Sequence, residues 1–192
     1  MIVQVGLVAM LMMVPLLAQP GPVEGRPDSP VRVLIYEDLR CSDCADFRVM
    51  MDTKILPRYA DRVAFLHRDF PLAKHPLARP AAIAARFFGA RDAKLGLEYR
   101  RRTLAAITET TEANFQDRLG AFAREHGIDP GEAAAALTDT RLAELVEKDF
   151  QEGVARGVAR TPTVFVNGKP FIETFTFAEI SKGIDAALAE TK

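Results

Sequence analysis

Residues 31–44 read VRVLIYEDLRCSDC, an apolar run followed by two cysteines that are separated by two residues. The run Val31–Tyr36 is rich in β-branched residues and has one arginine, which is typical of a strand that is buried on both faces. The pattern becomes helical from Ser42 to about Tyr59, because apolar residues recur every three or four positions at Cys44, Phe47, Met51 and Ile55. The cysteine pair therefore lies where a buried strand leads into a helix that packs on a sheet.

A second strand is expected at Val63–Phe70, so that residues 31–70 form a strand–helix–strand unit. Such a unit is long enough for the right-handed crossover that connects two parallel strands. The segment from about 79 to 157 differs in composition, since Ala, Leu, Arg and Glu dominate it. Pro80 and Pro130 suit first helical turns, and we expect about four or five helices here. This segment is interpreted as a helical insertion.

The last part of the chain carries a hairpin signal and a helix signal. A strand at Thr163–Val166 is followed by Asn167-Gly168 and then by Lys169–Glu173. Asn-Gly is preferred in a type I′ turn, because both central residues of that turn have positive φ. Thr176 and Glu179 have the spacing of a capping box, which opens a final helix. The order predicts an α/β fold with a mixed sheet, a strand–helix–strand unit, an embedded helical insertion, and then a hairpin and a helix.

The composition predicts a single globular domain. The chain has 192 residues, of which 48% are hydrophobic, and a formal net charge of −1, so nothing in it favours nucleic acid as a partner. Residues 1–22 have no charged side chain and contain the apolar run Val5–Ala18, which predicts a signal peptide or a membrane anchor. A linker over 23–30 and a folded domain over 31–192 complete the expected organisation. We expect an extracytoplasmic protein, either periplasmic or secreted.

The chain contains only two cysteines, so their spacing decides the chemistry expected of them. Free backbone N–H groups and the helix dipole stabilise an anion at a helix N-terminus, so we expect a reactive thiolate at Cys41. Cys44 lies one turn further along, on the inward face and within disulfide reach, and is the expected resolving thiol. A zinc site would need two more ligands, and the three histidines are not spaced to provide them. A purely structural disulfide is an alternative, although closing so short a loop gains little chain entropy.

Two further motifs flank the helical segment. Residues 68–72 with His75-Pro76 precede it, and residues 157–168, which read GVARTPTVFVNG, follow it. Together with the cysteine pair, these motifs resemble the DsbA-like group of thioredoxin-fold oxidoreductases, from about Val31 to Leu188. The resemblance implies a thioredoxin fold with a helical insertion. It also implies an exported thiol:disulfide oxidoreductase that needs no cofactor.

The same resemblance implies partners and substrate-binding residues. Pro162 would have a cis peptide bond and face the cysteines, and Thr161 before it would pair its backbone with a substrate chain. The substrates would be cysteine-containing proteins. A membrane redox partner, either a quinone-linked oxidase or a thiol reductase, would recycle the pair. No metal is expected at this site.

Three positions depart from the pattern of the relatives. Ile35 stands where many of them have a buried acid that relays protons. Glu37 and Asp38 lie nearer to the cysteines and are expected to be solvated, and the alternative is that they replace the missing acid. Ser42-Asp43 replaces the proline-containing dipeptide of the most oxidising members. Thr161 stands where strong oxidases often have an apolar residue. The direction of electron flow, as oxidase, isomerase or reductase, is therefore left open.

Residues next to Cys41 are expected to tune its reactivity. The carboxylate of Asp43 should oppose a thiolate at Cys41, whereas Arg40 should favour it from the other side. With Ser42, they form the expected redox-tuning set.

Two other functions are compatible with the same fold. One is a glutathione-dependent transferase or isomerase, whose members usually lack a second cysteine, so that Cys44 argues against it. The other is a redox-silent chaperone or binding domain, in which both thiols would be inert. The basic run Arg100–Arg102 is interpreted as a solvated helix face, and no role is expected for His67 and His75.

Overall fold

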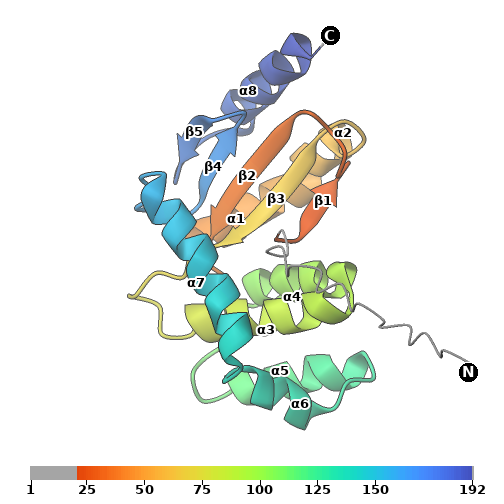
Figure 1. Ribbon diagram of the computed structural model, residues 1–192, viewed down its shortest axis with the longest axis vertical. Coiled ribbons are helices and arrows are strands. Elements are labelled where there is room, and N and C mark those ends of the chain that lie inside the picture. The colour runs from red at the N-terminus through yellow and green to blue at the C-terminus, as the bar shows by residue number, and fades with distance from the viewer. Residues whose placement is uncertain (1–20, 192) are drawn as a thin grey trace, which may run out of the picture.

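A five-stranded mixed sheet lies at the centre of the computed structural model, which describes residues 21–191 (Figure 1). The strand order is β1-β3-β2-β4-β5, in which β2 and β3 are parallel and the other neighbours are antiparallel. The strands are β1 (Val23–Gly25), β2 (Arg32–Glu37), β3 (Ala64–Asp69), β4 (Thr163–Val166) and β5 (Lys169–Ile172). This topology confirms the predicted mixed sheet, with a parallel strand–helix–strand unit and an antiparallel hairpin.

The crossover from β2 to β3 is a run of consecutive helical elements. It consists of α1 (Ser42–Met50), the π-helical turn η1 (Met51–Ile55) and α2 (Leu56–Tyr59). Together with α8 (Phe177–Glu190) this run packs on one face of the sheet. The core on this face contains three residues of the predicted helical stripe, Phe47, Met51 and Ile55, whereas the fourth, Cys44, packs against the helical block. Residues of the strands and of α8 complete this core, among them Val33, Ile35, Ile180 and Ile184. This packing holds the start of α1, where the cysteines lie, against the end of β2.

The C-terminal hairpin and helix follow the predicted signals. Asn167 and Gly168 connect β4 to β5 with φ angles of 44° and 88°, both positive as a type I′ turn requires. At the start of α8, the Thr176 hydroxyl accepts a hydrogen bond from the Glu179 N–H, and the Glu179 carboxylate accepts one from the Thr176 N–H. The structure therefore confirms both the turn and the capping box.

A helical block separates β3 from β4. It comprises α3 (Ala78–Arg91), α4 (Ala93–Ala105), α5 (Phe115–Glu125), α6 (Pro130–Ala136) and α7 (Thr140–Ala155). The block has a core of its own, in which the ring of Phe88 lies 4.9 Å from that of Tyr99 and 4.8 Å from that of Phe122. Cys41 and Cys44 belong to this core rather than to the one beneath the sheet. The cysteine pair thus lies at the junction between the block and the sheet.

Helices α3 and α4 approach each other closely at two glycines. A Cβ atom at Gly96 would lie 2.6 Å from the Gly89 Cα atom, which is closer than real side chains come. The glycines therefore allow the two helices to pack tightly against each other.

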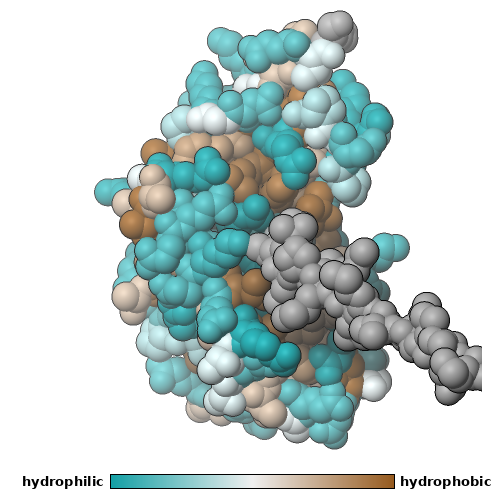
Figure 2. All heavy atoms as spheres, viewed as in Figure 1, coloured by the Kyte–Doolittle hydropathy of each residue, from teal (hydrophilic) through white to brown (hydrophobic). Residues whose placement is uncertain are grey.

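The long helix α7 runs diagonally from the helical block toward the β4 end of the sheet (Figure 1). It packs on the face of the sheet opposite to α1, where Tyr36, Phe70 and Val158 form a small core. Figure 2 shows apolar surface over the middle of the sheet beside this helix. Leu34 and Phe165, register partners in β2 and β4, are half-buried on this side.

The N-terminal part differs from the prediction. Residues 23–30 were expected to be a linker, but Val23–Gly25 form the edge strand β1, which pairs with β3. The physical reason is electrostatic, because Glu24 inserts its carboxylate among buried cations, as described below. The predicted signal peptide or anchor over 1–22 falls outside the described residues, except for Gly21 and Pro22. Within residues 21–191, no helix is both long enough and apolar enough to cross a membrane.

Candidate active site

Cys41 is the N-cap residue of α1. Its backbone is extended, with φ −93° and ψ 126°, and the helix begins at Ser42. An N-cap side chain normally accepts hydrogen bonds from the N–H groups of the second or third helical residue, which here are Asp43 and Cys44. A neutral thiol is a poor acceptor, whereas a thiolate can take the place of the usual capping oxygen. The local backbone therefore favours ionisation of Cys41.

The surroundings lower the pKa of Cys41 to about 5. The largest cause is the hydrogen bond from the Cys44 thiol, and burial acts against it. The Thr161 hydroxyl and the backbone N–H groups of Cys44 and Asp43 lower the pKa further. Cys41 is thus a thiolate at neutral pH, although only 5% of its surface is exposed.

Cys44 has the opposite character. It is 1% exposed, and its sulfur accepts a hydrogen bond from the Asp38 N–H at 3.4 Å. Burial raises its pKa well above the ordinary value, and the Cys41 sulfur and the Glu37 carboxylate raise it further. The Cys41 thiol is therefore acidic, whereas the buried Cys44 thiol keeps its proton at neutral pH. Disulfide exchange uses such a pair, because one thiolate attacks the substrate and a second thiol then resolves the mixed disulfide.

The loop before β4 forms the other wall of the site. The peptide bond between Thr161 and Pro162 is cis. The Cys41 sulfur lies 3.3 Å from the Thr161 carbonyl oxygen, to which it donates a hydrogen bond when it is a neutral thiol, so the structure brings the two predicted segments together. The Pro162 carbonyl oxygen accepts a hydrogen bond from the Glu173 N–H at 2.8 Å, which ties this loop to the end of β5.

The three expected tuning residues surround Cys41 in different ways. Ser42 is exposed, and Asp43 is partly exposed without an ion-pair partner among residues 21–191. Arg40 donates through Nη2 to the Thr110 carbonyl oxygen at 2.7 Å. Its guanidinium is therefore anchored on the loop after α4.

The structure contradicts the expectation that Glu37 and Asp38 are solvated. Glu37 is 4% exposed and Asp38 is 1% exposed. The Asp38 carboxylate lies 2.8 Å from Nδ1 of His75 and accepts a hydrogen bond from the Leu72 N–H at 2.9 Å. Asp38 therefore connects the cysteine loop to the segment after β3, and His75, to which no role was given, takes part in that connection.

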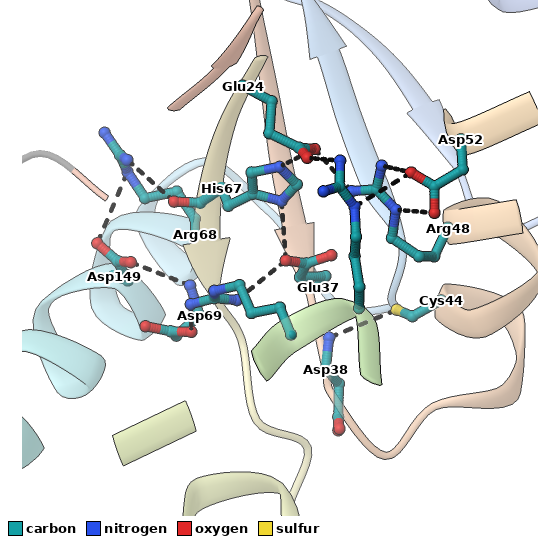
Figure 3. Close-up of polar contacts among 12 residues, drawn as sticks. Glu24, Glu37, Asp38, Cys44, Arg48, Asp52, His67, Arg68, Asp69 and Asp149 are labelled. Atoms are coloured by element: carbon teal, nitrogen blue, oxygen red, sulfur yellow. Dashed lines mark hydrogen bonds and ion pairs between the residues drawn. The ribbon is translucent and has the colours of Figure 1, made fainter. Parts of the chain in front are cut away.

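Glu37 belongs to a chain of buried charges that Figure 3 shows on the side of Cys44 toward β3. His67 on β3 lies between two carboxylates, with Nδ1 2.8 Å from Glu37 and Nε2 3.0 Å from Glu24. Arginines also bind both carboxylates, since Arg100 donates to Glu37 at 2.9 Å and Arg48 donates to Glu24 at 2.6 Å. Because ionised carboxylates only accept hydrogen bonds, both ring nitrogens of His67 must carry protons. His67 is therefore an imidazolium.

The pKa values agree with this geometry. Burial alone would lower the pKa of His67, but the charges of Glu37 and Glu24 raise it above its ordinary value. Burial alone would raise the pKa of Glu37, but His67 and then Arg100 hold it below its ordinary value. Glu37 is thus a stable anion close enough to influence Cys44.

The same network reaches the helical block. Arg100 also donates to Asp69, which is the register partner of Glu37 on β3. Arg86 on α3 donates to Asp69 at 2.5 Å and to Asp149 on α7. The interpretation of Arg100 as solvated was wrong, since it is 2% exposed. The sequence did contain a signal for this network, because Glu37 and Asp69 stand at the adjacent ends of two parallel strands. Two buried carboxylates side by side require cations to balance them.

One cluster of possible metal ligands lies away from the cysteines. Glu98, Glu125 and His126 place one ligand atom each within 4.8 Å of one another. Arg102 donates to Glu98 at 2.5 Å and to Glu125 at 2.6 Å. The guanidinium therefore already balances the two carboxylates.

Known proteins that are similar to this chain have the same fold. A family model described as Thioredoxin matches residues 18–186. The oxidised form of BdbD from Bacillus subtilis superposes with a TM-score of 0.78 and 26% identity, covering 90% of this chain and 97% of that one. Wolbachia pipientis alpha-DsbA1 gives a TM-score of 0.76 and 17% identity, covering 88% and 91%. The catalytic domain of Proteus mirabilis ScsC gives 0.72 and 19%, covering 88% and 89%. At these identities, alpha-DsbA1 and the ScsC domain show only that they share the fold of this chain.

Curated relatives are much longer proteins. The Na(+)/H(+) antiporter NhaA 1 of Mycolicibacterium gilvum is 26% identical over 166 residues, which are 85% of this chain and 26% of that protein. The protein of the same name from Salinispora arenicola is 29% identical over 182 residues, 94% of this chain and 27% of that protein. The chain therefore spans about a quarter of the length of the curated relatives that it matches.

Proposed function

This chain belongs to the thioredoxin family, and from that premise we propose that it exchanges disulfides with cysteine-containing proteins through Cys41 and Cys44. One observation carries the proposal. The N-cap thiol of α1 has a pKa of about 5, while the thiol one turn further along is buried with a strongly raised pKa. Thioredoxin-fold neighbours with the same topology support it, among them BdbD and alpha-DsbA1.

In the reducing direction, the Cys41 thiolate attacks one sulfur of a substrate disulfide. The substrate S–S bond breaks, one substrate thiolate leaves, and a mixed disulfide joins Cys41 to the substrate. Cys44 then loses its proton and attacks the Cys41 sulfur, which releases the second substrate thiolate and forms the Cys41–Cys44 disulfide. Two electrons pass from the protein to the substrate, and the reverse sequence oxidises a substrate dithiol.

Glu37 acts on Cys44 through its negative charge in this proposal. Relatives often have a buried acid at the position of Ile35, and Glu37 lies two residues further along β2 on the same face of the strand. Its charge is one of the causes that raise the pKa of Cys44. Because His67 and Arg100 hold Glu37 as a carboxylate, its charge keeps Cys44 protonated until the mixed disulfide forms, and the proton that Cys44 releases on attack ends on the substrate thiolate that leaves.

Thr161 and Pro162 bind the substrate chain beside Cys41 in this proposal, with Ser42, Asp43 and Arg40 tuning the thiolate. Disulfide exchange of this kind belongs in an oxidising compartment, so the protein acts outside the cytoplasm. A membrane redox partner, either a quinone-linked oxidase or a thiol reductase, recycles the pair. The reduction potential of the pair decides which of the two it is.

Trapping experiments test the proposal. Cys44→Ser should accumulate mixed disulfides with substrate proteins, because release needs the second thiol. Cys41→Ser should form none, because the attacking thiolate is lost. The trapped species are read on non-reducing gels and by mass spectrometry. Normal turnover by Cys44→Ser, or equal trapping by the two variants, would refute the assignment of attack to Cys41 and release to Cys44.

A further inference from the structure

A cavity of about 310 Å³ opens beside the cysteine pair, between α1 and the segment that connects β5 to α8. Its size is at the lower end of the range of about 300–1,000 Å³ that is usual for ligand pockets. Among the residues that line it are Asp43, Asp46, Phe47, Glu173 and Phe175. Acidic and aromatic residues thus share one small cavity.

Both walls of this cavity, α1 and the segment after β5, are connected to the segments that carry Cys41 and Thr161. Asp43 follows Cys41 by two residues in α1. Glu173, on the opposite wall, donates its N–H to the Pro162 carbonyl oxygen at 2.8 Å. A polypeptide bound across Cys41 and Thr161 would therefore continue directly into the cavity on one side of its cysteine.

The floor of the cavity is apolar. Phe47 is buried and Phe175 is half-buried, and their ring centroids lie 5.3 Å apart in an edge-to-face arrangement. With a rise of 1.5 Å per residue, Phe47 lies about 9 Å along the helix from Cys41. An extended chain covers that distance in about three residues. A substrate side chain about two to four residues from the substrate cysteine can therefore reach the floor of the cavity.

The rim of the cavity carries uncompensated negative charge. Asp43 and Asp46 lie one helical turn apart on the same side of α1, and neither makes an ion pair or a side-chain hydrogen bond within residues 21–191. Glu173 does have a partner, since Arg160 donates to it at 2.5 Å. Two carboxylates that line the cavity therefore have no ion-pair partner within residues 21–191.

We infer, on the basis of the proposed function, that this cavity binds a lysine or arginine side chain of the substrate polypeptide, close in sequence to the cysteine that reacts with Cys41. The aliphatic stem of such a side chain packs on Phe47 and Phe175, while its charged group reaches the rim. Asp43 and Asp46 supply the opposite charge. An acidic side chain at the same place is repelled by both carboxylates, so the site selects basic segments.

Matched peptides test this inference. Each peptide contains one cysteine held as a mixed disulfide with 2-mercaptoethanol, and a Lys, Gln or Glu placed two to four residues before or after it. Reduced protein converts each mixed disulfide to a free peptide and free 2-mercaptoethanol while its own cysteines become a disulfide. At low ionic strength the Lys peptide should react about tenfold faster than the Glu peptide on the side that enters the cavity, with Gln between them. In about 1 M salt the difference should largely disappear.

Variants of the protein show which residues cause the preference for the Lys peptide. In Asp43→Asn/Asp46→Asn the ratio of the Lys rate to the Glu rate should fall close to one. The ratio is the proper readout, because any change in the reactivity of Cys41 affects both peptides equally. Glu112→Gln/Glu144→Gln makes the same change in net charge at two exposed residues that line none of the cavity, and should keep the wild-type ratio.

The possible results separate this inference from the proposed function. Bis(2-hydroxyethyl) disulfide has no side chain to bind, so reduced protein that fails to react with it would refute the proposed function itself. Reaction with this disulfide but equal rates for the Lys and Glu peptides would overturn only the inference. A Lys preference that survives Asp43→Asn/Asp46→Asn would also overturn it, because the selectivity would then arise elsewhere.

Discussion

The Cys41 sulfur lies 3.3 Å from the Thr161 carbonyl oxygen and joins two segments that are 120 residues apart in the chain. The Thr161 hydroxyl is buried in the same place and has no hydrogen-bond partner among the described residues. After the Cys44 thiol, it is one of the groups that lower the pKa of Cys41. A thiolate at Cys41 can therefore accept a hydrogen bond from the Thr161 hydroxyl, which has no acceptor when Cys41 is a neutral thiol.

Thr161→Val should accordingly raise the pKa of Cys41 by about one unit, since a hydrogen bond to a charged group contributes about 1.5–3 kcal/mol. The reduction potential should fall by about 30 mV, because the reduced thiolate loses stabilisation. Thiolate absorbance against pH and equilibration with glutathione measure the two changes. Thr161→Ser keeps the hydroxyl and should leave both values near those of the wild type. A potential that rises in Thr161→Val would exclude this role of the hydroxyl.

Alkylation should distinguish the two thiols of the reduced protein. Iodoacetamide should modify Cys41 well before Cys44, because Cys41 is a thiolate and Cys44 is a buried thiol with a raised pKa. The rate at Cys41 should rise with a midpoint near pH 5, far below the value of about 8.5 for a free thiol. Peptide mass spectrometry after quenching at each pH gives both rates. Equal rates would contradict the assignment of Cys41 as the nucleophile.

Asp43→Asn should make the pair more oxidising. If the carboxylate lies about 7 Å from the Cys41 sulfur in a mostly solvated medium, Coulomb's law gives roughly 1 kcal/mol of repulsion toward the thiolate. Removing that charge should raise the reduction potential by about 20 mV, since about 30 mV corresponds to 1.4 kcal/mol. Asp43→His should raise it further at pH values where the histidine is protonated. A potential that stays constant or falls would exclude the electrostatic role of Asp43.

The charge on His67 should make the folded protein less stable at alkaline pH. The unfolded histidine has a pKa of about 6.5, and the folded value is higher, so its contribution is complete below about pH 6.5 and is lost as the pH rises toward the folded value. The slope is at most about 1.4 kcal/mol per pH unit for one proton. Glu24 and Glu37, whose pKa values are lowered, stabilise above about pH 4.5 and lose that effect in acid. Urea unfolding of the oxidised protein, in which Cys41 cannot titrate, should therefore show greatest stability in mildly acidic buffer.

NMR titration of the histidine ring protons provides a direct measurement. The chain has three histidines, so spectra of His75→Gln and His126→Gln assign the signal of His67. That signal should stay in its protonated position past neutral pH. Titration of His67 with a midpoint below the ordinary value would contradict the assignment of an imidazolium between Glu24 and Glu37.

The elements around the cysteines could be predicted because each has a local signal. The apolar stripe of α1, the Asn167-Gly168 turn and the capping box at Thr176 depend on residues close together in the sequence. The position of Cys41 at a helix start was also predictable from local information, and the lowered pKa of Cys41 agrees with it. Local patterns of this kind are enough to place the site within the fold.

The buried charges could not be predicted in this way. Arg100 belongs to a basic run, and only its long-range contacts with Glu37 and Asp69 reveal that it is buried. The short strand β1 lies in a segment rich in proline and has no apolar pattern of its own. Its Glu24 carboxylate binds Arg48 and His67, which are distant in the sequence. These interactions exist only after the chain has folded.

The buried ion pairs between the sheet and the helical block also restrict motion. Arg86 and Arg100 extend from helices of the block to Asp69 and Glu37 at the ends of the two parallel strands. A hinge movement that separated the block from the sheet would leave these charges unpaired away from water, at a cost of about 3–5 kcal/mol for each broken pair. The ion pairs therefore oppose a separation of the block from the sheet. If the proposed function holds, substrates of different shapes are accommodated by local rearrangement of the loops that surround Cys41.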